Sequence, residues 1–380
     1  MPRRLRPLRV AISCYPTFGG SGVIATELGI ALADRGHRVH FISYAQPQRL
    51  REFHERITYH EVDVATYPLF KYPPYDLALA SKMIEVAASN GLDLVHVHYA
   101  IPHAISAYLA REMLGDRRLR VVTTLHGTDI TLVGNNKAYF PATRFGIQRS
   151  DAVTAVSDYL KRETIRTFGV GQDVVVVPNF VDTRRFRPDA PAARKKCFGR
   201  KGERLLAHVS NFRPVKRIAD VIHVFATVAR KTPARLLMIG DGPELPNAER
   251  LVEELGLRER VEFFGLLEAV EAVLPHADLF LLPSEFESFG LAALEAMACG
   301  VPPIVTETGG TGEVVEHGVN GYLCRVGDIE CMAQTALDVL DDPALLRRLK
   351  RNARLTAVRR FRRDRVVQRY EEVYRDVLRR

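Results

Sequence analysis

Residues 279–306, LFLLPSEFESFGLAALEAMACGVPPIVT, show most clearly how this chain of 380 residues folds. The run LFLLPS is typical of a buried strand, GLAALEAMACG of a buried helix, and VPPIVT of a second strand. The segment EFESF joins the first strand to the helix and carries polar groups. A strand, a helix and a strand in this order indicate a parallel β–α–β unit whose sheet is covered by helices.

The same alternation of short apolar runs and helical stretches fills the chain. It begins with LRVAIS at residues 8–13, and it restarts with RLLAHVS at residues 204–210. The segment between the halves, near residues 180–200, is rich in Pro, Arg and Lys, and we predict a linker there. The sequence therefore predicts an α/β protein with two doubly wound, Rossmann-like domains. Because ligands of such sheets bind at the carboxyl ends of the strands, we expect the site in a cleft between two facing sheets.

The net charge of +9 is confined to one end of the chain. Residues 347–380 contain 14 Lys or Arg and four Asp or Glu, whereas the other 346 residues have a net charge of −1. We interpret this tail as the solvated face of one or two Arg-rich helices. Contact with phospholipid headgroups is the alternative. No sequence motif supports binding to nucleic acid.

The cysteines and the N-terminus indicate the compartment. The five cysteines are odd in number and form no C-x-x-C pair, which is typical of a reduced protein without a disulfide framework. The apolar run near the N-terminus is too short for a signal peptide, and no run is long enough to cross a membrane. We predict a cytoplasmic protein without stable membrane insertion.

Polar residues collect where the predicted strands end. The loop CYPTFGGSG is equally consistent with a tight turn and with a phosphate loop, and His126 follows a later strand in LHGTD. Arg213 and Lys216 in SNFRPVKR could neutralise a diphosphate, or they could be solvated loop cations. Glu287 and Glu295 could accept hydrogen bonds from the hydroxyls of a ligand with two polyol parts, a ribose and a sugar.

His96 and His98 share one face of the predicted strand in VHVHYAIPH. Two such histidines could hold a metal ion, but no acidic or thiol partner follows at ligand spacing. We therefore predict that both are buried or hydrogen-bonded structural histidines, and that the protein has no metal site.

The motif ESFGLAALE resembles the E-x7-E frame of the retaining GT-B glycosyltransferases of family 4, and AMACGVP follows it as in that family. The segments GGSG, LHGTD, FRPVKR and TETGGTGEVVEHGVNGYL stand in the family's order, so the resemblance covers nearly the whole chain. The stretches CYPTFGGSGVIATELGIALADRGHRVHFIS and SNFRPVKR are similar to the malate-using subgroup of the bacillithiol pathway.

This resemblance implies a GT-B fold, with an acceptor-binding domain at residues 1–182 and a nucleotide-sugar-binding domain at residues 183–359. It implies that a helix at residues 360–380 packs back on the first domain. The implied reaction moves N-acetylglucosamine from UDP-GlcNAc to the hydroxyl of L-malate and releases UDP, the first step of bacillithiol biosynthesis. The resemblance implies no cofactor and no metal, and it leaves a homodimer open.

The resemblance also implies the site residues, position by position. The catalytic positions are His126, Arg213, Lys216 and Glu287. The donor-binding positions are Gly20, Ser21, Asn211, Ser288, Phe289, Gly290, Leu291 and Glu295. The acceptor-binding positions are Tyr99, Thr124 and Arg144.

Each of these positions has an implied role. His126 would contact the 6-hydroxyl of the sugar, Glu287 would bind the sugar, and Glu295 would bind the ribose. Arg213 and Lys216 would hold the diphosphate. The wider family usually has Arg at the position of Asn211, and this departure shifts phosphate binding toward Arg213. Arg144 offers a fork of donors for a carboxylate of malate.

The mechanism implied by the family retains the anomeric configuration without an enzymatic nucleophile. The protein would then act by positioning and by stabilising charge. A nucleophilic Glu287 is the alternative. Two other functions stay open at this point: a retaining transferase with an inositol-phosphate or lipid acceptor, and a nucleotide-sugar-binding protein without turnover.

Overall fold

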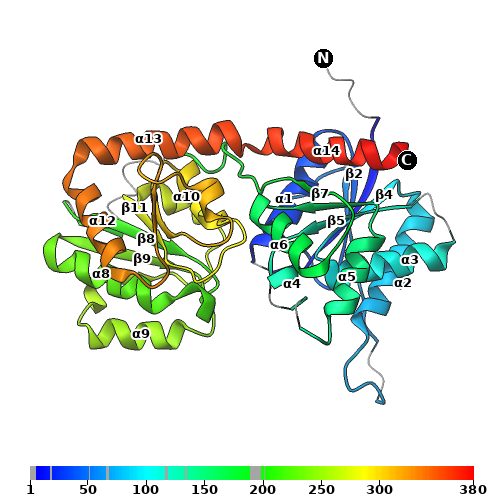
Figure 1. The fold of residues 1–380 in the computed structure, drawn as a ribbon, viewed down its shortest axis with the longest axis horizontal. Helices are drawn as coiled ribbons and strands as arrows, with labels where there is room; N and C mark the ends of the chain where they lie inside the picture. The colour runs from blue at the N-terminus through cyan, green and yellow to red at the C-terminus, as the bar shows by residue number, and fades with distance from the viewer. Residues whose placement is uncertain are drawn as a thin grey trace. The chain divides into compact units, whose positions relative to one another are not determined.

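The computed structural model describes residues 6–17, 19–50, 52–65, 68–115, 119–131, 133–134, 136–188, 198–200 and 202–380. The chain divides into two compact units, Met1–Asn179 with Asp364–Arg380 and Phe180–Arg363 (Figure 1). The middle of the predicted linker, residues 189–197, lies outside the described part of the chain.

The first unit is built around a seven-stranded sheet whose neighbouring strands are parallel. In spatial order the strands are β3 (Ile57–Glu61), β2 (Arg38–Ser43), β1 (Arg9–Ser13), β4 (Leu94–His98), β5 (Arg120–Leu125), β6 (Ala152–Ala155) and β7 (Val174–Val176). The helices are α1 (Gly20–Asp34), α2 (Tyr75–Asn90), α3 (Ile105–Leu114), α4 (Thr128–Thr131), α5 (Phe140–Arg149), α6 (Asp158–Phe168) and α14 (Arg363–Arg379). The strand order reverses between β1 and β4, which marks the topological switch point.

The second unit contains a six-stranded sheet, again with parallel neighbours. Its strands in spatial order are β10 (Val261–Phe263), β9 (Ala234–Ile239), β8 (Arg204–Val209), β11 (Leu279–Leu282), β12 (Pro303–Thr306) and β13 (Tyr322–Cys324). Its helices are α8 (Ile218–Lys231), α9 (Leu245–Glu254), α10 (Leu291–Ala298), α11 (Thr311–Val314), α12 (Ile329–Asp341) and α13 (Pro343–Arg360). Here the switch point lies between β8 and β11. The prediction of two doubly wound sheets is confirmed.

Strand β4 shows how the two faces of the first sheet are used. Val95 and Val97 point into an apolar core that also contains buried residues of α2 and α3. Successive side chains of a strand point to opposite faces, so His96 and His98 face the other way. On that face the hydroxyl of Tyr374 on α14 forms a hydrogen bond with His96, which places the C-terminal helix on this unit (Figure 1).

A carboxylate anchors α14 to the first unit. The guanidinium of Arg35 donates two hydrogen bonds to Glu371, of 2.7 and 2.6 Å, and His37 Nε2 lies 3.1 Å from the same carboxylate. Burial by itself would raise the pKa of Glu371, but the bonds to His37 and Arg35 outweigh it and hold this pKa at about 2.

The basic tail forms two helices, α13 and α14, as the charge pattern predicts. Arg347, Arg348 and Arg351 of α13 are exposed. Arg354 instead donates hydrogen bonds to the backbone carbonyls of Thr183, Phe186 and Ala298, and so ties α13 to the start of its own unit. Among the described residues, none of the helices combines the length and the apolar sequence that a membrane crossing requires.

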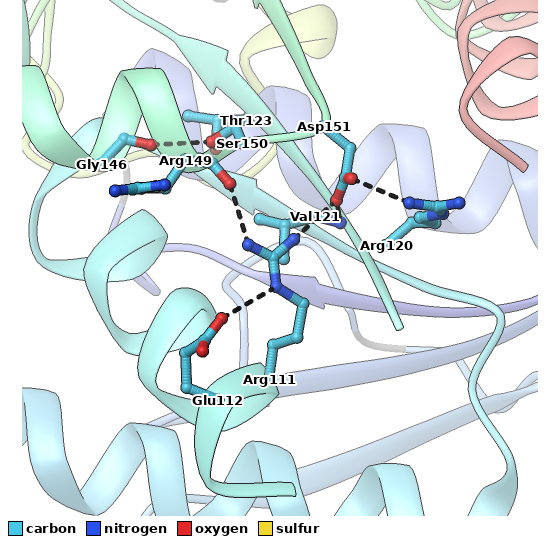
Figure 2. A network of polar contacts seen from close by, with 9 residues as sticks. All are labelled: Arg111, Glu112, Arg120, Val121, Thr123, Gly146, Arg149, Ser150 and Asp151. Atoms are coloured by element: carbon cyan, nitrogen blue, oxygen red, sulfur yellow. Dashed lines mark hydrogen bonds and ion pairs between the residues drawn. The ribbon is translucent and has the colours of Figure 1, made fainter. Parts of the chain in front are cut away.

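The amino ends of β5 and β6 are joined by a network of polar contacts around Asp151 (Figure 2). Its carboxylate accepts hydrogen bonds from Arg111 (2.9 Å), Arg120 (3.2 Å) and the backbone N–H of Val121 (2.7 Å). The network lies at the edge of the sheet opposite to the carboxyl ends, where ligands bind. We therefore interpret it as structural.

Candidate active site

At the switch point of the first sheet, the loop after β1 meets the residue that follows β4. The hydroxyl of Tyr99 donates a 2.8 Å hydrogen bond to Ser21 Oγ, so two predicted site residues 78 positions apart are brought together. Gly20 is exposed and opens α1, whose N-terminus has no side-chain cap. A Cβ atom on Gly22 would lie 2.6 Å from the Tyr15 carbonyl oxygen, so glycine is required for the loop to pack on this first turn.

His126 follows β5 and is held by His98. Its Nε2 atom lies 2.8 Å from His98 Nδ1, and the two rings stack with centroids 5.0 Å apart. Burial lowers the pKa of His126 to about 3 and that of His98 well below 6.5, so both rings are neutral at pH 7. With its Nε2 engaged, the neutral ring keeps Nδ1 as its other hydrogen-bonding atom, and the contact of His126 with a sugar hydroxyl stays a prediction.

Thr124 and His96 lie next to the His98–His126 pair, and the rings of His96 and His98 stack with centroids 4.6 Å apart. Thr124 Oγ1 lies 2.7 Å from His96 Nε2 and 2.6 Å from Thr154 Oγ1, while His96 Nδ1 lies 2.7 Å from the Tyr374 hydroxyl. His96 and His98 are fully buried, which confirms the prediction that they are buried or hydrogen-bonded. The hydroxyl of Thr124 is thus engaged inside the unit, and its role toward an acceptor stays a prediction.

Asp129 joins the loops that follow β4 and β5. Its carboxylate accepts hydrogen bonds from the backbone N–H groups of Ala100 (3.1 Å), His126 (3.2 Å) and Gly127 (3.0 Å). Burial raises its pKa to about 6, although these three bonds act in the opposite direction. The site prediction missed this residue, although its place one turn after a strand end was a usable signal.

Arg144 lies on α5 and shares no hydrogen bond with the residues just described. Its side chain is exposed, and it makes no hydrogen bond or ion pair with any residue that the structure describes. A guanidinium in this state can bind a carboxylate ligand without first losing a protein partner. Its assignment to malate stays a prediction.

At the switch point of the second sheet, Lys216 and Glu287 form an ion pair. Lys216 Nζ lies 2.5 Å from Glu287 Oε1, and Ser284 Oγ donates a 2.8 Å hydrogen bond to the same oxygen. The side chains of Lys216 and Glu287 are 20% and 12% exposed. The structure thus brings together a cation predicted for the diphosphate and a carboxylate predicted for the sugar. Ser284, which was not predicted, lies two positions after the end of β11, in the same strand-to-helix loop as Glu287.

Backbone contacts hold this ion pair in place. The N–H of Glu285 donates to the Val215 carbonyl (2.8 Å), and the N–H of Gly310 donates to the Glu287 carbonyl (2.9 Å). Gly309 has a φ of 56°, and a Cβ atom there would lie 1.9 Å from the Glu287 oxygen, so glycine is required. Arg217, next to Lys216, also has a positive φ of 50°. Such strain is typical of functional loops.

Helix α10 and the loop before it carry most of the donor-binding predictions. Gly290 precedes the helix with a φ of 89°, and Leu291 is its first residue. Phe289 is buried and packs against Phe361 with ring centroids 5.6 Å apart. Glu295 is buried in the middle of the helix, and Ser288 is half-buried in the loop before it. These positions lie in one segment beside Glu287.

Asn211 and Arg213 precede the turn that carries Lys216. Arg213 is exposed, and its carbonyl accepts a 2.8 Å hydrogen bond from the Lys216 N–H. The Oδ1 atom of Asn211 is buried and has no hydrogen-bond partner among the described residues. A buried polar atom without a partner is unusual in a protein, and the role of Asn211 in donor binding stays a prediction.

The described residues contain no group of three His, Cys, Asp or Glu side chains that could hold a metal ion. The cations of the candidate site are side chains, Lys216 and Arg213. Metal-independence remains a prediction, to be tested by chelation.

Comparison with protein families finds two matches that together span most of the chain. Residues 18–185 match the model described as Glycosyltransferase Family 4. Residues 189–356 match the model described as Glycosyl transferases group 1. The two matched ranges contain the candidate residues of the first and the second unit.

Individual relatives agree with these matches. The chain is 49% identical, over 98% of its own length and 98% of the relative's, to N-acetyl-alpha-D-glucosaminyl L-malate synthase from Bacillus anthracis. It is 30% identical to a GDP-mannose-dependent alpha-(1-6)-phosphatidylinositol monomannoside mannosyltransferase from Mycolicibacterium smegmatis, over 70% of this chain and 72% of that one. Among solved structures it is similar to Anabaena Alr3699/HepE in complex with UDP-glucose, with a TM-score of 0.83, 21% identity, and coverage of 97% and 100%.

Proposed function

The chain belongs to glycosyltransferase family 4 and has the GT-B fold, and from this premise we propose that it transfers N-acetylglucosamine from UDP-GlcNAc to the hydroxyl group of L-malate. The products would be N-acetylglucosaminyl malate and UDP, the first step of bacillithiol biosynthesis. The choice of both substrates is supported by the 49% identity, over nearly the full length of both chains, to an enzyme of that name.

The observation that carries the catalytic part of the proposal is the ion pair at the second switch point. Lys216 offers an ammonium group where a departing diphosphate needs one, and Glu287 offers a carboxylate that can accept hydrogen bonds from sugar hydroxyls. Ser284 and the Gly309 turn fix Glu287, so its carboxylate is oriented before the donor binds. Arg213, exposed and close in sequence, would share the diphosphate charge.

The first unit would position the sugar and the acceptor. His126, neutral and held by His98, would donate or accept one hydrogen bond at the 6-hydroxyl of the sugar. Arg144 would bind one malate carboxylate through two parallel N–H donors, and Tyr99 would add a neutral donor by turning its O–H from Ser21 to the ligand. A dianionic acceptor beside an anionic donor needs such a cation, since repulsion would otherwise weaken its binding.

The proposed reaction retains the anomeric configuration. The malate hydroxyl attacks the anomeric carbon on the face from which UDP departs, the bond from that carbon to the phosphate oxygen breaks, and the hydroxyl proton passes to a phosphate oxygen of UDP. Lys216 and Arg213 stabilise the charge that develops on the diphosphate. Glu287 as a nucleophile is the alternative, and the bonds from Lys216 and Ser284 to its Oε1 would make the carboxylate a weaker nucleophile because they stabilise its negative charge.

The experiment that tests this proposal measures UDP release from a panel of donors and acceptors. We expect rapid release only when UDP-GlcNAc and L-malate are both present. Release with an inositol phosphate or a lipid acceptor, but not with malate, would replace the acceptor and keep the transferase. No release with any acceptor, despite binding of UDP-GlcNAc, would support a binding protein instead.

Cytoplasmic location and a homodimer belong to the same proposal. The buried, unpaired thiols of Cys14 and Cys299 are compatible with a reducing compartment. Cell fractionation tests the first expectation, and sedimentation equilibrium of the purified chain tests the second.

A further inference from the structure

A pair of cysteines lies apart from the proposed catalytic groups, in the second unit. Cys324 ends β13, and Cys331 lies in the first turn of α12. Their Sγ atoms are 2.7 Å apart. The two sulfur atoms are therefore in direct contact, as they must be before a disulfide bond can form between them.

Hydrogen bonds fix the backbone on both sides of this pair. The carbonyl of Cys324 accepts a 2.8 Å bond from the N–H of Glu307, and the N–H of Cys331 donates a 2.9 Å bond to Asp328 Oδ1. The ring of His317 accepts a 3.2 Å bond from the N–H of Leu323. Because the two sulfur atoms already meet in this fixed frame, joining them requires little movement of the chain.

The two thiols line one cavity of about 450 Å³ but differ in how far they reach into it. Cys324 is 4% exposed, whereas Cys331 is half-buried. Burial, together with the contact to Cys331, raises the pKa of the Cys324 thiol to about 12, so Cys331, which is also the more exposed of the two, is expected to react first. The cavity also has charged groups of both signs, which would suit a small zwitterion: Glu307, Arg325 and Asp328.

We propose that Cys324 and Cys331 form a reversible disulfide by exchange with a low-molecular-weight disulfide of an amino-acid thiol. The Cys331 thiolate attacks one sulfur of the small disulfide, forms a mixed disulfide and releases one small thiol. The Cys324 sulfur, losing its proton to solvent, then attacks the Cys331 sulfur and releases the second small thiol. The protein loses two hydrogen atoms, and the small disulfide gains them.

This site is independent of the proposed transferase reaction. It uses none of the residues placed there, and its test does not require turnover. Cys14 and Cys299 serve as internal controls, because both are buried and burial raises the pKa of each thiol above its usual value. Cys197 lies outside the described residues, so peptide mapping is used to assign every modified cysteine.

The experiment incubates the reduced full-length chain with cystine, quenches with an alkylating agent, and maps the peptides by mass spectrometry. The wild-type chain is expected to yield a cross-linked Cys324–Cys331 peptide, about 2 Da lighter than the two reduced peptides, with Cys14 and Cys299 still free. Cys324→Ser is expected to accumulate a stable half-cystine adduct on Cys331. Cys331→Ser is expected to leave Cys324 at least tenfold slower to react than Cys331 in the wild-type chain.

Three results would overturn the proposal. Both thiols of the wild-type chain could stay free in excess cystine, both could carry separate adducts, or Cys324 could react as fast without Cys331. The role of the cavity is checked by comparing cystine with bis(2-hydroxyethyl) disulfide, which carries no charge. For each disulfide, the rate of reaction with the folded chain is divided by its rate with the urea-unfolded chain. This ratio should be severalfold higher for cystine than for bis(2-hydroxyethyl) disulfide, and equal ratios would contradict recognition by the charged cavity.

Discussion

Replacement of Lys216 by Ala examines the catalytic ion pair most sharply. Loss of one preorganised charge at a leaving group costs about 3 kcal/mol in the barrier, so we expect kcat to fall about a hundredfold. The variant also leaves Glu287 without its cationic partner. Exposed pairs contribute below about 1 kcal/mol and buried ones about 3–5 kcal/mol when one partner is removed. With side chains 20% and 12% exposed, this pair should lose about 1–2 kcal/mol of folding stability.

The two effects are separated by measuring UDP release and thermal unfolding on the same samples. Lys350→Ala is a matched control, since Lys350 Nζ lies 2.9 Å from Asp278 Oδ1 in the same unit but outside the candidate site. It should lower the unfolding temperature by a similar amount and leave kcat within about twofold of the wild-type value. A Lys216→Ala enzyme with wild-type kcat, or an equal loss of kcat in Lys350→Ala, would refute the assignment.

Three further predictions concern charge. The pKa of Glu371 is held at about 2 in the folded chain, against 4.5 in the unfolded chain, so its carboxylate stabilises the fold above pH 4.5 and loses this effect as the pH falls toward 2. The difference in unfolding temperature between the wild-type chain and Glu371→Gln should therefore shrink over that range. A constant difference would contradict the ion pair of Arg35 with Glu371 as its cause. Activity should survive exhaustive chelation within about twofold, because side-chain cations neutralise the diphosphate, and an absolute need for Mg²⁺ or Mn²⁺ would contradict this. Arg144→Lys should raise the KM for malate about tenfold with little change in the KM for the donor, whereas Arg149→Lys on the same helix should change neither.

Much of the fold and part of the site could be predicted because periodicity and strand ends are local features of the sequence. The helix between residues 279 and 306 separates two parallel strands as predicted, and Glu287 lies in the loop between strand and helix. Lys216 and Glu287 were both placed at carboxyl ends of strands, which put them at the same edge of the sheet.

The pairings themselves depend on strand order, which alternation of strands and helices does not specify. The bond between Lys216 and Glu287 spans 71 positions and requires that β8 and β11 be neighbours. The orientation of His126 depends on a ring nitrogen of His98, and the positive φ of Arg217 depends on tertiary packing. Side-chain orientation and strain of this kind leave no periodic signal in the sequence.

The central claim is that this chain attaches N-acetylglucosamine to malate with retention of configuration. The most direct measurement is proton NMR of the product formed from UDP-GlcNAc and L-malate, which reports both the glycosylated oxygen and the anomeric configuration. The account predicts one product, with an α-linkage from the sugar to the malate hydroxyl, formed in equal amount with UDP. A β-linked product, or UDP released by hydrolysis without any malate glycoside, would contradict it.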